Sequence, residues 1–216
     1  MKYIVANWKM NMNMQDVISW AAGFDTEVLN GKVTVIVAPS FLHIFPVAEL
    51  MKKIGVEVSA QDVSIEEKGA HTGETGAFQL KEMCKYAIVG HSERKETAEV
   101  VAKKIDACLS EGLTPIVCFV EPEKIELYKR PGIIYAWEDP ANISKNGVYK
   151  EKSTKEIKEG VKKIRAILKN NEPLLYGGSV NGQNVPDLVN IEKLDGVLVG
   201  NASLDPKHFS GIVAAY

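Results

Sequence analysis

Residues 86–94 read Tyr-Ala-Ile-Val-Gly-His-Ser-Glu-Arg, an apolar run that turns polar directly after its glycine. A short run of this kind, uninterrupted by polar residues, predicts a strand buried on both faces. His91, Glu93 and Arg94 would then lie at the carboxyl end of that strand, where α/β proteins keep their binding and catalytic residues. A single histidine in such a position is more often structural than functional, so the role of His91 depends on the rest of the chain.

The overall composition argues against several classes of function. The 216-residue chain is 45% hydrophobic and 25% charged, with a formal net charge of −2. Because there is no basic excess, we expect no nucleic-acid partner. The apolar run near the N-terminus is broken at Asn7 and Lys9, so it is no signal peptide, and no segment approaches the ~20 apolar residues of a membrane span. We therefore expect no membrane association.

The cysteines and histidines show no metal-binding pattern. Cys84, Cys108 and Cys118 are odd in number and form no C-x-x-C pair. They are typical of buried, reduced thiols, which favours a cytoplasmic location. The four histidines are too scattered along the chain to suggest a metal site.

Seven further segments match the pattern of a buried strand: residues 3–6, 32–38, 56–60, 114–120, 133–137, 173–176 and 194–199. Helical spacing predicts helices over residues 14–29 and 41–53, up to about residue 83, after a Thr97 cap, around residues 157–167, and over 209–215. Residues 122–131 leave room for only a reduced fifth helix. No linker or repeat is present, so we expect one domain over residues 1–216.

Eight buried strands that alternate with helices, at about 27 residues per unit, place the chain in the α/β class and leave two architectures. One is a closed (β/α)8 barrel and the other is a doubly wound open sheet. The open sheet should carry a G-x-G-x-x-G motif after an early strand, and none is present. We therefore predict a compact (β/α)8 TIM barrel in which the fifth helix is reduced to a turn.

Polar residues follow most of the predicted strands. In a closed barrel these residues would share the rim at the carboxyl ends of the strands. They are Asn7 and Lys9, Gln61, His91 and Glu93, Glu121, Glu138, Gly177-Gly178-Ser179, and Gly200-Asn201. Glycine turns after the seventh and eighth strands let backbone N–H groups approach an anion, and this fold commonly binds phosphate there. The sequence therefore predicts a phosphate site beside a lysine, a histidine and carboxylates.

Six motifs in order along the chain resemble the triosephosphate isomerase family. They are Ala6-Asn7-Trp8-Lys9-Met10-Asn11, Gly69-Ala70-His71-Thr72-Gly73-Glu74, Val89-Gly90-His91-Ser92-Glu93-Arg94, Gly112-Leu113-Thr114-Pro115-Ile116-Val117-Cys118, Tyr176-Gly177-Gly178-Ser179-Val180 and Asp195-Gly196-Val197-Leu198-Val199-Gly200. The resemblance covers nearly the whole chain. It implies the interconversion of dihydroxyacetone phosphate and glyceraldehyde 3-phosphate, with a triose phosphate as substrate and no cofactor.

The resemblance also implies a role for each residue at the rim. Glu138 resembles the general base that moves a proton between two substrate carbons, and His91 resembles the electrophile that polarises the carbonyl. Lys9 resembles the cation that stabilises the enediolate and attracts the phosphate ester. Asn7 resembles the residue that orients the substrate, and Glu93 a carboxylate beside the catalytic pair. This set fits the chemistry, because proton abstraction next to a carbonyl needs a positioned base and positive potential where charge develops.

Backbone N–H groups are the phosphate ligands that the resemblance implies. Ser179, Gly200 and Asn201 match positions that bind phosphate in the family, and Gly178 belongs to the same turn as Ser179. Ser144 stands where a lid glycine usually donates its N–H. The lid itself departs from the family pattern, since residues 139–147 read Asp-Pro-Ala-Asn-Ile-Ser-Lys-Asn-Gly, with the proline displaced and no tryptophan. Lid closure matters because it excludes water from the intermediate.

Two alternative functions remain open. The altered lid is compatible with a phosphosugar-binding barrel of impaired isomerase activity, and another barrel enzyme acting on phosphosugars is a third possibility. The loop of residues 64–76 resembles the segment with which family members reach a second subunit. Thr72, Gly73 and Glu74 would therefore lie at a subunit interface. We expect a homodimer, with a tetramer as the alternative because the reduced helices could expose further surface.

Overall fold

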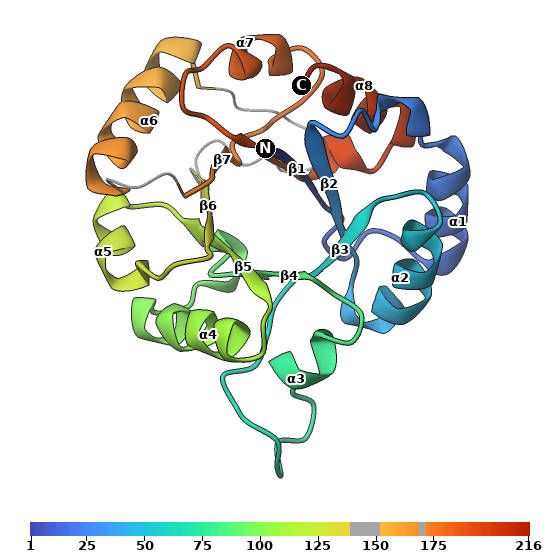
Figure 1. Ribbon diagram of the computed structural model, residues 1–216, viewed down its shortest axis with the longest axis vertical. Coiled ribbons are helices and arrows are strands. Elements are labelled where there is room, and N and C mark those ends of the chain that lie inside the picture. The colour runs from blue at the N-terminus through green and yellow to red at the C-terminus, as the bar shows by residue number, and fades with distance from the viewer. Residues whose placement is uncertain (139–151, 169–171) are drawn as a thin grey trace.

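The computed structural model describes residues 1–138, 152–168 and 172–216 as a closed barrel of eight parallel strands, surrounded by helices (Figure 1). The strands follow one another around the barrel in chain order. They are β1 (Lys2–Asn7), β2 (Val33–Ala38), β3 (Glu57–Ala60), β4 (Tyr86–Val89), β5 (Thr114–Phe119), β6 (Ile134–Trp137), β7 (Leu174–Tyr176) and β8 (Gly196–Val199). The predicted (β/α)8 barrel is confirmed, and the open sheet is wrong.

The barrel closes where the first strand meets the last. β1 pairs with β2 on one side and with β8 on the other, in a register that places Tyr3 beside Gly196. Gly196 has φ +147°, and a Cβ there would lie 1.8 Å from the carbonyl oxygen of Tyr3. The closure therefore requires glycine, because only a residue without a side chain fits this approach.

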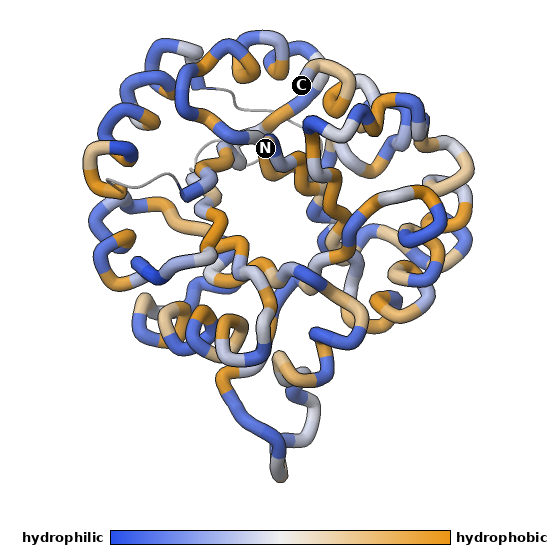
Figure 2. Tube along the Cα trace, in the orientation of Figure 1, coloured by the Kyte–Doolittle hydropathy of each residue, from blue (hydrophilic) through white to orange (hydrophobic). Residues whose placement is uncertain are grey.

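Apolar side chains fill both sides of the barrel wall. One group lies inside the barrel and includes Val5, Ile36, Ile88, Ile116 and Leu198. A larger group lies between the strands and the helices. Figure 2 shows hydrophobic residues along the ring of strands and on the inward sides of the helices. Burial on both faces explains why the strands are continuous apolar runs without alternation.

The helices of the outer layer are α1 (Met14–Gly23), α2 (Ile44–Lys52), α3 (Ala77–Leu80), α4 (Ala98–Ser110), α5 (Ile125–Tyr128), α6 (Thr154–Leu168), α7 (Val185–Val189) and α8 (Pro206–Ala214). Short 3-10 turns are η1 (Thr26–Val28), η2 (Phe41–His43), η3 (Ser92–Arg94), η4 (Pro122–Lys124) and η6 (Asn201–Ser203). The reduced fifth helix is confirmed, since α5 has four residues. The Thr97 cap is also confirmed, because its side chain accepts the N–H of Val100.

Three helix predictions are wrong in part. The helix expected over residues 14–29 ends at Gly23, because Phe24 is extended and Asp25 caps the separate turn η1. α3 ends at Leu80, before the expected end near residue 83. α8 begins earlier than expected, at Pro206, where the Asp205 side chain accepts the His208 N–H. The helix α7 was not predicted. Within the described residues, no helix has the length and apolar character needed to cross a membrane.

Candidate active site

A small cavity lies at the carboxyl ends of β1, β4, β6, β7 and β8. It is lined by Asn7, Lys9, His91, Glu138, Gly177, Ser179, Val180, Leu198, Gly200 and Asn201. Residues from positions 7 to 201 meet here because parallel strands in a closed barrel all end at one rim. The structure therefore brings together eight of the rim residues selected from the sequence.

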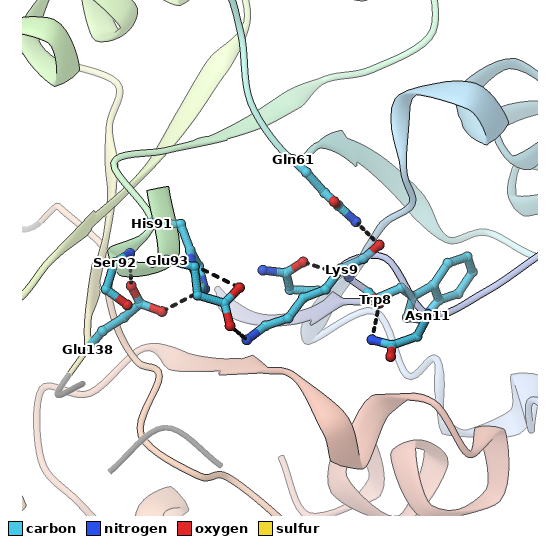
Figure 3. A network of polar contacts seen from close by, with 9 residues as sticks. Trp8, Lys9, Asn11, Gln61, His91, Ser92, Glu93 and Glu138 are labelled. Carbon is cyan, nitrogen blue, oxygen red and sulfur yellow. Dashed lines mark hydrogen bonds and ion pairs between the residues drawn. The ribbon is translucent and has the colours of Figure 1, made fainter. Parts of the chain in front are cut away.

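His91 and Glu138 contact each other directly in this cavity (Figure 3). The Nε2 atom of His91 lies 3.0 Å from Oε1 of Glu138, and the backbone N–H of Ser92 donates to Oε2 at 3.1 Å. Both side chains are buried, with 7% of His91 and 2% of Glu138 exposed. The carboxylate is thus held by two donors on the β4 side of the rim.

The hydrogen bonds of His91 define its tautomer. The backbone N–H of Glu93 donates to Nδ1 of His91 at 3.3 Å, in the arrangement of a cap on the short turn η3. A ring nitrogen that accepts an N–H carries no proton itself, so the proton of the neutral imidazole lies on Nε2. Nε2 is the atom that points toward Glu138 and the cavity. His91 can therefore donate a hydrogen bond into the cavity without being charged.

Lys9 is held in an unusual backbone conformation, with φ +51°. Its N–H donates to the side chain of Asn7 at 3.1 Å, and its carbonyl accepts from the side chain of Gln61 at 2.9 Å. The Lys9 ammonium pairs with Glu93 at 2.7 Å. A left-handed conformation at a non-glycine residue costs about 1 kcal/mol or more and persists where neighbours over-determine it, often at functional sites. Hydrogen bonds to Asn7 and Gln61 provide the constraints on the Lys9 backbone. Gln61 does not line the cavity and acts through Lys9.

Two residues around Glu138 make room for its carboxylate. A Cβ on Gly177 would lie 3.2 Å from Cγ of Glu138, so the absence of a side chain at Gly177 lets the glutamate pack closely. On the barrel axis, the buried thiol of Cys118 faces the carboxylate. Burial raises the pKa of Cys118 well above its usual value, and the charge of Glu138 and a hydrogen bond to it add to this shift. Cys118 is therefore a neutral thiol below the carboxylate.

The loop after β7 is shaped by amide groups. Ser179 has φ +50°, and its carbonyl accepts from the side chains of Asn181 at 3.2 Å and Asn184 at 3.0 Å. The side chain of Asn184 also accepts the N–H of Asn181. Gly178 packs on the far side of this loop, since a Cβ there would lie 2.2 Å from the Tyr176 hydroxyl, and it is not among the residues that line the cavity.

The turn after β8 forms the neighbouring wall. Ser203 donates twice to the carbonyl of Gly200, from its N–H at 2.9 Å and from its hydroxyl at 2.7 Å. The indole of Trp20 donates to the carbonyl of Ser203 at 2.8 Å, which fixes the turn to α1. A Cβ on Gly200 would lie 3.6 Å from Cε of Lys9. Gly200 therefore lies beside the Lys9 side chain, so the cavity lining places this cation next to the turns after β7 and β8.

A buried ion network supports the loop that carries His91. Lys104, only 5% exposed, pairs with Asp62 at 2.5 Å and with Glu96 at 2.6 Å, and Arg94 pairs with both carboxylates. Burial alone would raise the pKa of Glu96, but hydrogen bonds from Lys104 and Arg94 outweigh it and hold this pKa below its usual value. For Asp62 burial prevails and the pKa is raised. The network connects the end of β3, the turn η3 and α4.

Several predicted residues lie elsewhere. Glu121 follows β5 as expected, but it does not line the cavity and pairs with Lys124 at 2.9 Å. Glu93 lies at the edge of the cavity, where it reaches Lys9. Ser144 and the lid of residues 139–147 lie outside the described residues.

The loop of residues 64–76 projects from the barrel between β3 and α3 (Figure 1). Residues 65–74 are all exposed, including Thr72, Gly73 and Glu74. The Ser64 N–H donates to the Thr75 carbonyl at 2.9 Å and closes the base of the loop. At its far end, Glu66 and His71 lie 3.6 Å apart.

Sequence reasoning missed the supporting residues of this site. Lys104 lies on the apolar stripe of its helix, between Val101 and Cys108, and a lysine in that position is a signal of a buried ion pair. Cys118 and Asn184 carry no comparable signal, since a cysteine in a buried strand and an asparagine in a turn are both common. Among the described residues, no group of three or more His, Cys, Asp or Glu side chains could hold a metal ion.

Comparison with known proteins finds similarity along nearly the whole chain. The family model of triosephosphate isomerase matches residues 2–216. The triosephosphate isomerase of Thermodesulfovibrio yellowstonii is 34% identical over 242 aligned positions, which cover 98% of this chain and 98% of that protein. Those of Dehalococcoides mccartyi and Aquifex aeolicus are each 32% identical, over 97% and 100% of this chain and 94% and 99% of those proteins.

Proposed function

The chain belongs to the triosephosphate isomerase family, and from that premise we propose how its own residues catalyse the family's reaction. The reaction interconverts dihydroxyacetone phosphate and D-glyceraldehyde 3-phosphate, an isomerisation between a ketose and an aldose within glycolysis. It moves one proton between neighbouring carbons and one between the oxygens that they carry, and it passes through an enediolate. The residues must therefore supply a base, a stabiliser for a developing oxyanion and an anchor for the phosphate.

Glu138 is the general base. It is the carboxylate at the centre of the cavity, and its contacts with the His91 ring and the Ser92 N–H hold it in one orientation. In the substrate complex the carboxylate has to leave the His91 ring and face the substrate carbon. It then takes a proton from the carbon beside the carbonyl and returns it to the neighbouring carbon. The absent side chain of Gly177 leaves space for this movement.

His91 and Lys9 stabilise the negative charge that develops on oxygen. Oε1 of Glu138 lies 3.0 Å from Nε2 of His91. Once Glu138 moves away, the N–H at Nε2 can donate to the substrate carbonyl, whose oxygen then takes the position of Oε1. The Lys9 ammonium, held through Asn7 and Gln61, adds positive potential on the same side. Glu93, which pairs with Lys9, keeps this cation oriented while the site is empty.

The phosphate group binds across the two uncharged turns. Backbone N–H groups of Ser179, Gly200 and Asn201 are the donors that we assign, with Gly178 shaping the first turn from behind and Ser144 contributing from the lid. Ser179, Gly200 and Asn201 line the cavity with Lys9, which supports this assignment. Backbone donors at close range suit a phosphate, because several N–H groups can converge on its oxygens without a bulky side chain.

A phosphosugar-binding barrel without turnover is the second candidate, suggested by the lid sequence. Such a protein would need the phosphate turns alone. The convergence of Lys9, His91 and Glu138 in one cavity favours an active enzyme, because binding alone gives no reason to bury a carboxylate against a neutral histidine. The single observation that carries the active-site assignment is the contact between His91 and Glu138.

The exposed surface supports a homodimer. The loop of residues 64–76 projects with ten exposed residues in succession, including Thr72, Gly73 and Glu74. These residues would be buried if the loop inserted into a second copy of the chain. Large apolar side chains also lie exposed near the rim: Met10 is 95% exposed, Leu42 83% and Phe45 65%. Burying such residues in an interface is favourable at about 25 cal/mol per Å². A tetramer would need a further surface, for which Leu127 on α5, 52% exposed, is a candidate.

Two further expectations belong to this proposal. Residues 1–216 act as one catalytic domain, since strands from both ends of the chain pair in the barrel. The protein works in the cytoplasm, because its three cysteines are buried and free of disulfides, as in proteins of reducing compartments.

A coupled isomerase assay with the Glu138→Asp variant tests the assignment. Aspartate retracts the carboxylate by one methylene, and a misplacement of about 1 Å can cost ~10²-fold in rate. We expect kcat to fall by about that factor while inhibition by a phosphoglycolate-type ligand is unchanged. A wild-type protein that binds this ligand without turnover would favour the binding-protein candidate. A Glu138→Asp variant with full kcat would remove Glu138 from the chemistry.

A further inference from the structure

Among the residues that the structure describes, the imidazole of His208 contacts the loop after β7 from outside. Residues 177–184 read Gly-Gly-Ser-Val-Asn-Gly-Gln-Asn, which includes no ionisable group. The side chains of Asn181 and Asn184 stabilise the loop from within. A further hydrogen bond connects the loop to α8, since the backbone N–H of Gly182 donates to Nε2 of His208 at 2.9 Å.

His208 is itself held firmly. It lies in the first turn of α8, where its backbone N–H donates to the capping carboxylate of Asp205 at 2.7 Å. The next residue, Phe209, is fully buried and packs against Trp20 and Phe24. A Cβ on Gly182 would lie 3.0 Å from Nε2, so the ring sits close against this glycine. His208 therefore ties a phosphate-binding loop to a rigid helix.

The direction of this hydrogen bond determines when it can exist. Nε2 accepts the Gly182 N–H, so it carries no proton, and the ring is neutral with its proton on Nδ1. In the imidazolium form both ring nitrogens are donors and neither can accept. Protonation would then place two donors against each other at 2.9 Å. Imidazole is the side chain that changes charge between about pH 5 and 8, which makes this bond sensitive to ordinary changes in pH.

We propose that His208 is a positioning residue for the phosphate site, and that its protonation loosens the loop and weakens phosphate binding in mildly acidic solution. The proposal rests on the assignment of Ser179 as a phosphate ligand. Ser179 lies three residues before Gly182 in a strained conformation, with φ +50°, so its N–H depends on external support for its direction. Loss of the anchor lowers affinity for the phosphate group and leaves the proton transfer at Glu138 unchanged.

Other charged groups around α8 do not change this argument. On the helix itself they are Asp205 and Lys207. The elements that pack most extensively against α8 are α1, η1 and η6, which contribute Asp16 and Glu27, with Asp25 at the cap of η1. The loop of residues 177–184 contributes none. All of these groups are present in every variant compared below, so a difference between variants reports on His208.

Competitive inhibition by sulfate provides the test, because the sulfate dianion keeps its charge throughout the mildly acidic and neutral range, whereas a phosphate ester titrates. Two substitutions distinguish the loss of the hydrogen-bond acceptor for Gly182 from the gain of a positive charge at position 208. In His208→Gln the amide oxygen reaches about as far as Nε2 and accepts at every pH. In His208→Leu the acceptor is lost. His43→Gln is the matched control, since the His43 ring contacts the side chain of Ser40 at 3.2 Å, in the turn η2 that follows β2.

At about pH 8 we expect His208→Gln to bind sulfate as the wild type does and His208→Leu to bind it about fivefold more weakly, the effect of one lost hydrogen bond. At about pH 5.5 the wild type should approach His208→Leu, while His208→Gln keeps its advantage. The substrate KM should follow the same pattern. The value of kcat should change less than about twofold, because lost phosphate binding affects the substrate complex and the transition state equally. His43→Gln should follow the wild type throughout.

Two results would overturn the proposal in distinguishable ways. If wild type and His208→Gln respond to pH identically, protonation of His208 does not weaken phosphate binding, and the proposal is wrong. If sulfate does not compete with substrate in the wild type, the phosphate site itself is misassigned, whatever the role of His208. Should His208→Leu fail to fold, the comparison of wild type with His208→Gln decides the question alone.

Discussion

The two sides of the cavity are built on different principles. On the side of β1, β4 and β6, ionisable side chains face the cavity: Lys9, His91 and Glu138, with Glu93 at the edge. On the side of β7 and β8, residues 177–184 and 200–203 include no ionisable side chain. Proton transfer needs groups that can change their charge, whereas a permanent anion can be bound by fixed backbone N–H groups. The first side is therefore suited to chemistry and the second to binding.

The supports of the two sides differ in the same way. A buried ion network of Asp62, Arg94, Glu96 and Lys104 lies under the loop that carries His91. Side-chain amides and one imidazole hold the loop after β7. Buried ion pairs are costly to disrupt because a remaining charge is left unpaired, whereas a lost neutral hydrogen bond costs less. Substitutions in the ion network should therefore lower the stability of the whole fold. Substitutions that remove hydrogen bonds to the loop after β7 should instead weaken ligand binding.

The largest effect is expected for Lys104→Met, which removes the cation shared by Asp62 and Glu96. The buried Asp62 and the partly buried Glu96 then keep Arg94 as their charged partner. Breaking a buried ion pair typically costs roughly 3–5 kcal/mol, and we expect about 3 kcal/mol here because Arg94 remains. Thermal unfolding should begin roughly 6–12 °C lower. Lys103→Met, on the exposed side of the same helix, is the control. Equal melting temperatures for the two variants would show that the network contributes little.

An intermediate effect is expected for Asn184→Ala on the binding side. This change removes the amide that donates to Ser179 at 3.0 Å and accepts from Asn181 at 3.0 Å. We expect affinity for a phosphate-containing inhibitor to fall about tenfold, the effect of two neutral hydrogen bonds, with kcat much less affected. Steady-state kinetics with inhibitor titration measures both. Gln183→Ala, an exposed neighbour, should leave affinity unchanged, and a similar loss there would contradict the assigned role of Asn184.

The smallest effect concerns the thiol of Cys118 on the chemistry side. Burial raises its pKa well above the usual value. As pH rises above about 9, the unfolded chain loses this proton while the folded protein keeps it, so the free energy of unfolding decreases with increasing pH. The contribution is about 1 kcal/mol by pH 9.5. Melting temperatures between pH 8 and 9.5 should therefore fall less steeply for Cys118→Ala than for the wild type. Equal slopes would contradict the shift.

The strands and the rim could be predicted because their signals are local. A strand buried on both faces must be a continuous apolar run, and the residue after each run must lie at the rim of a closed barrel. This reasoning placed His91, Glu138 and Lys9 in one cavity. A position at the end of a strand does not by itself place a side chain in the cavity, since Glu121 pairs instead with a lysine three residues away.

Other features depend on contacts that no local pattern records. The apolar spacing after Met14 continues beyond Gly23, yet the helix ends there, where Pro206 of α8 approaches so closely that a Cβ would meet it at 2.8 Å. The anchor at His208 joins residues 26 positions apart through a backbone N–H. The ion network joins Asp62 and Lys104, 42 positions apart. Such pairs become visible only when the barrel has brought their elements together.

The pairing of β1 with β8 has a consequence for the synthesis of the protein. On the ribosome, β1 emerges first and can pair with β2 early, but its other neighbour is made last. At a synthesis rate of about 5–20 residues per second, one edge of β1 stays unpaired for roughly 10 to 40 s, until β8 has been made. During this time the nascent chain presents an unpaired strand edge, which is prone to aggregation. It also has no complete active site, because Asn201 belongs to the same cavity as Asn7.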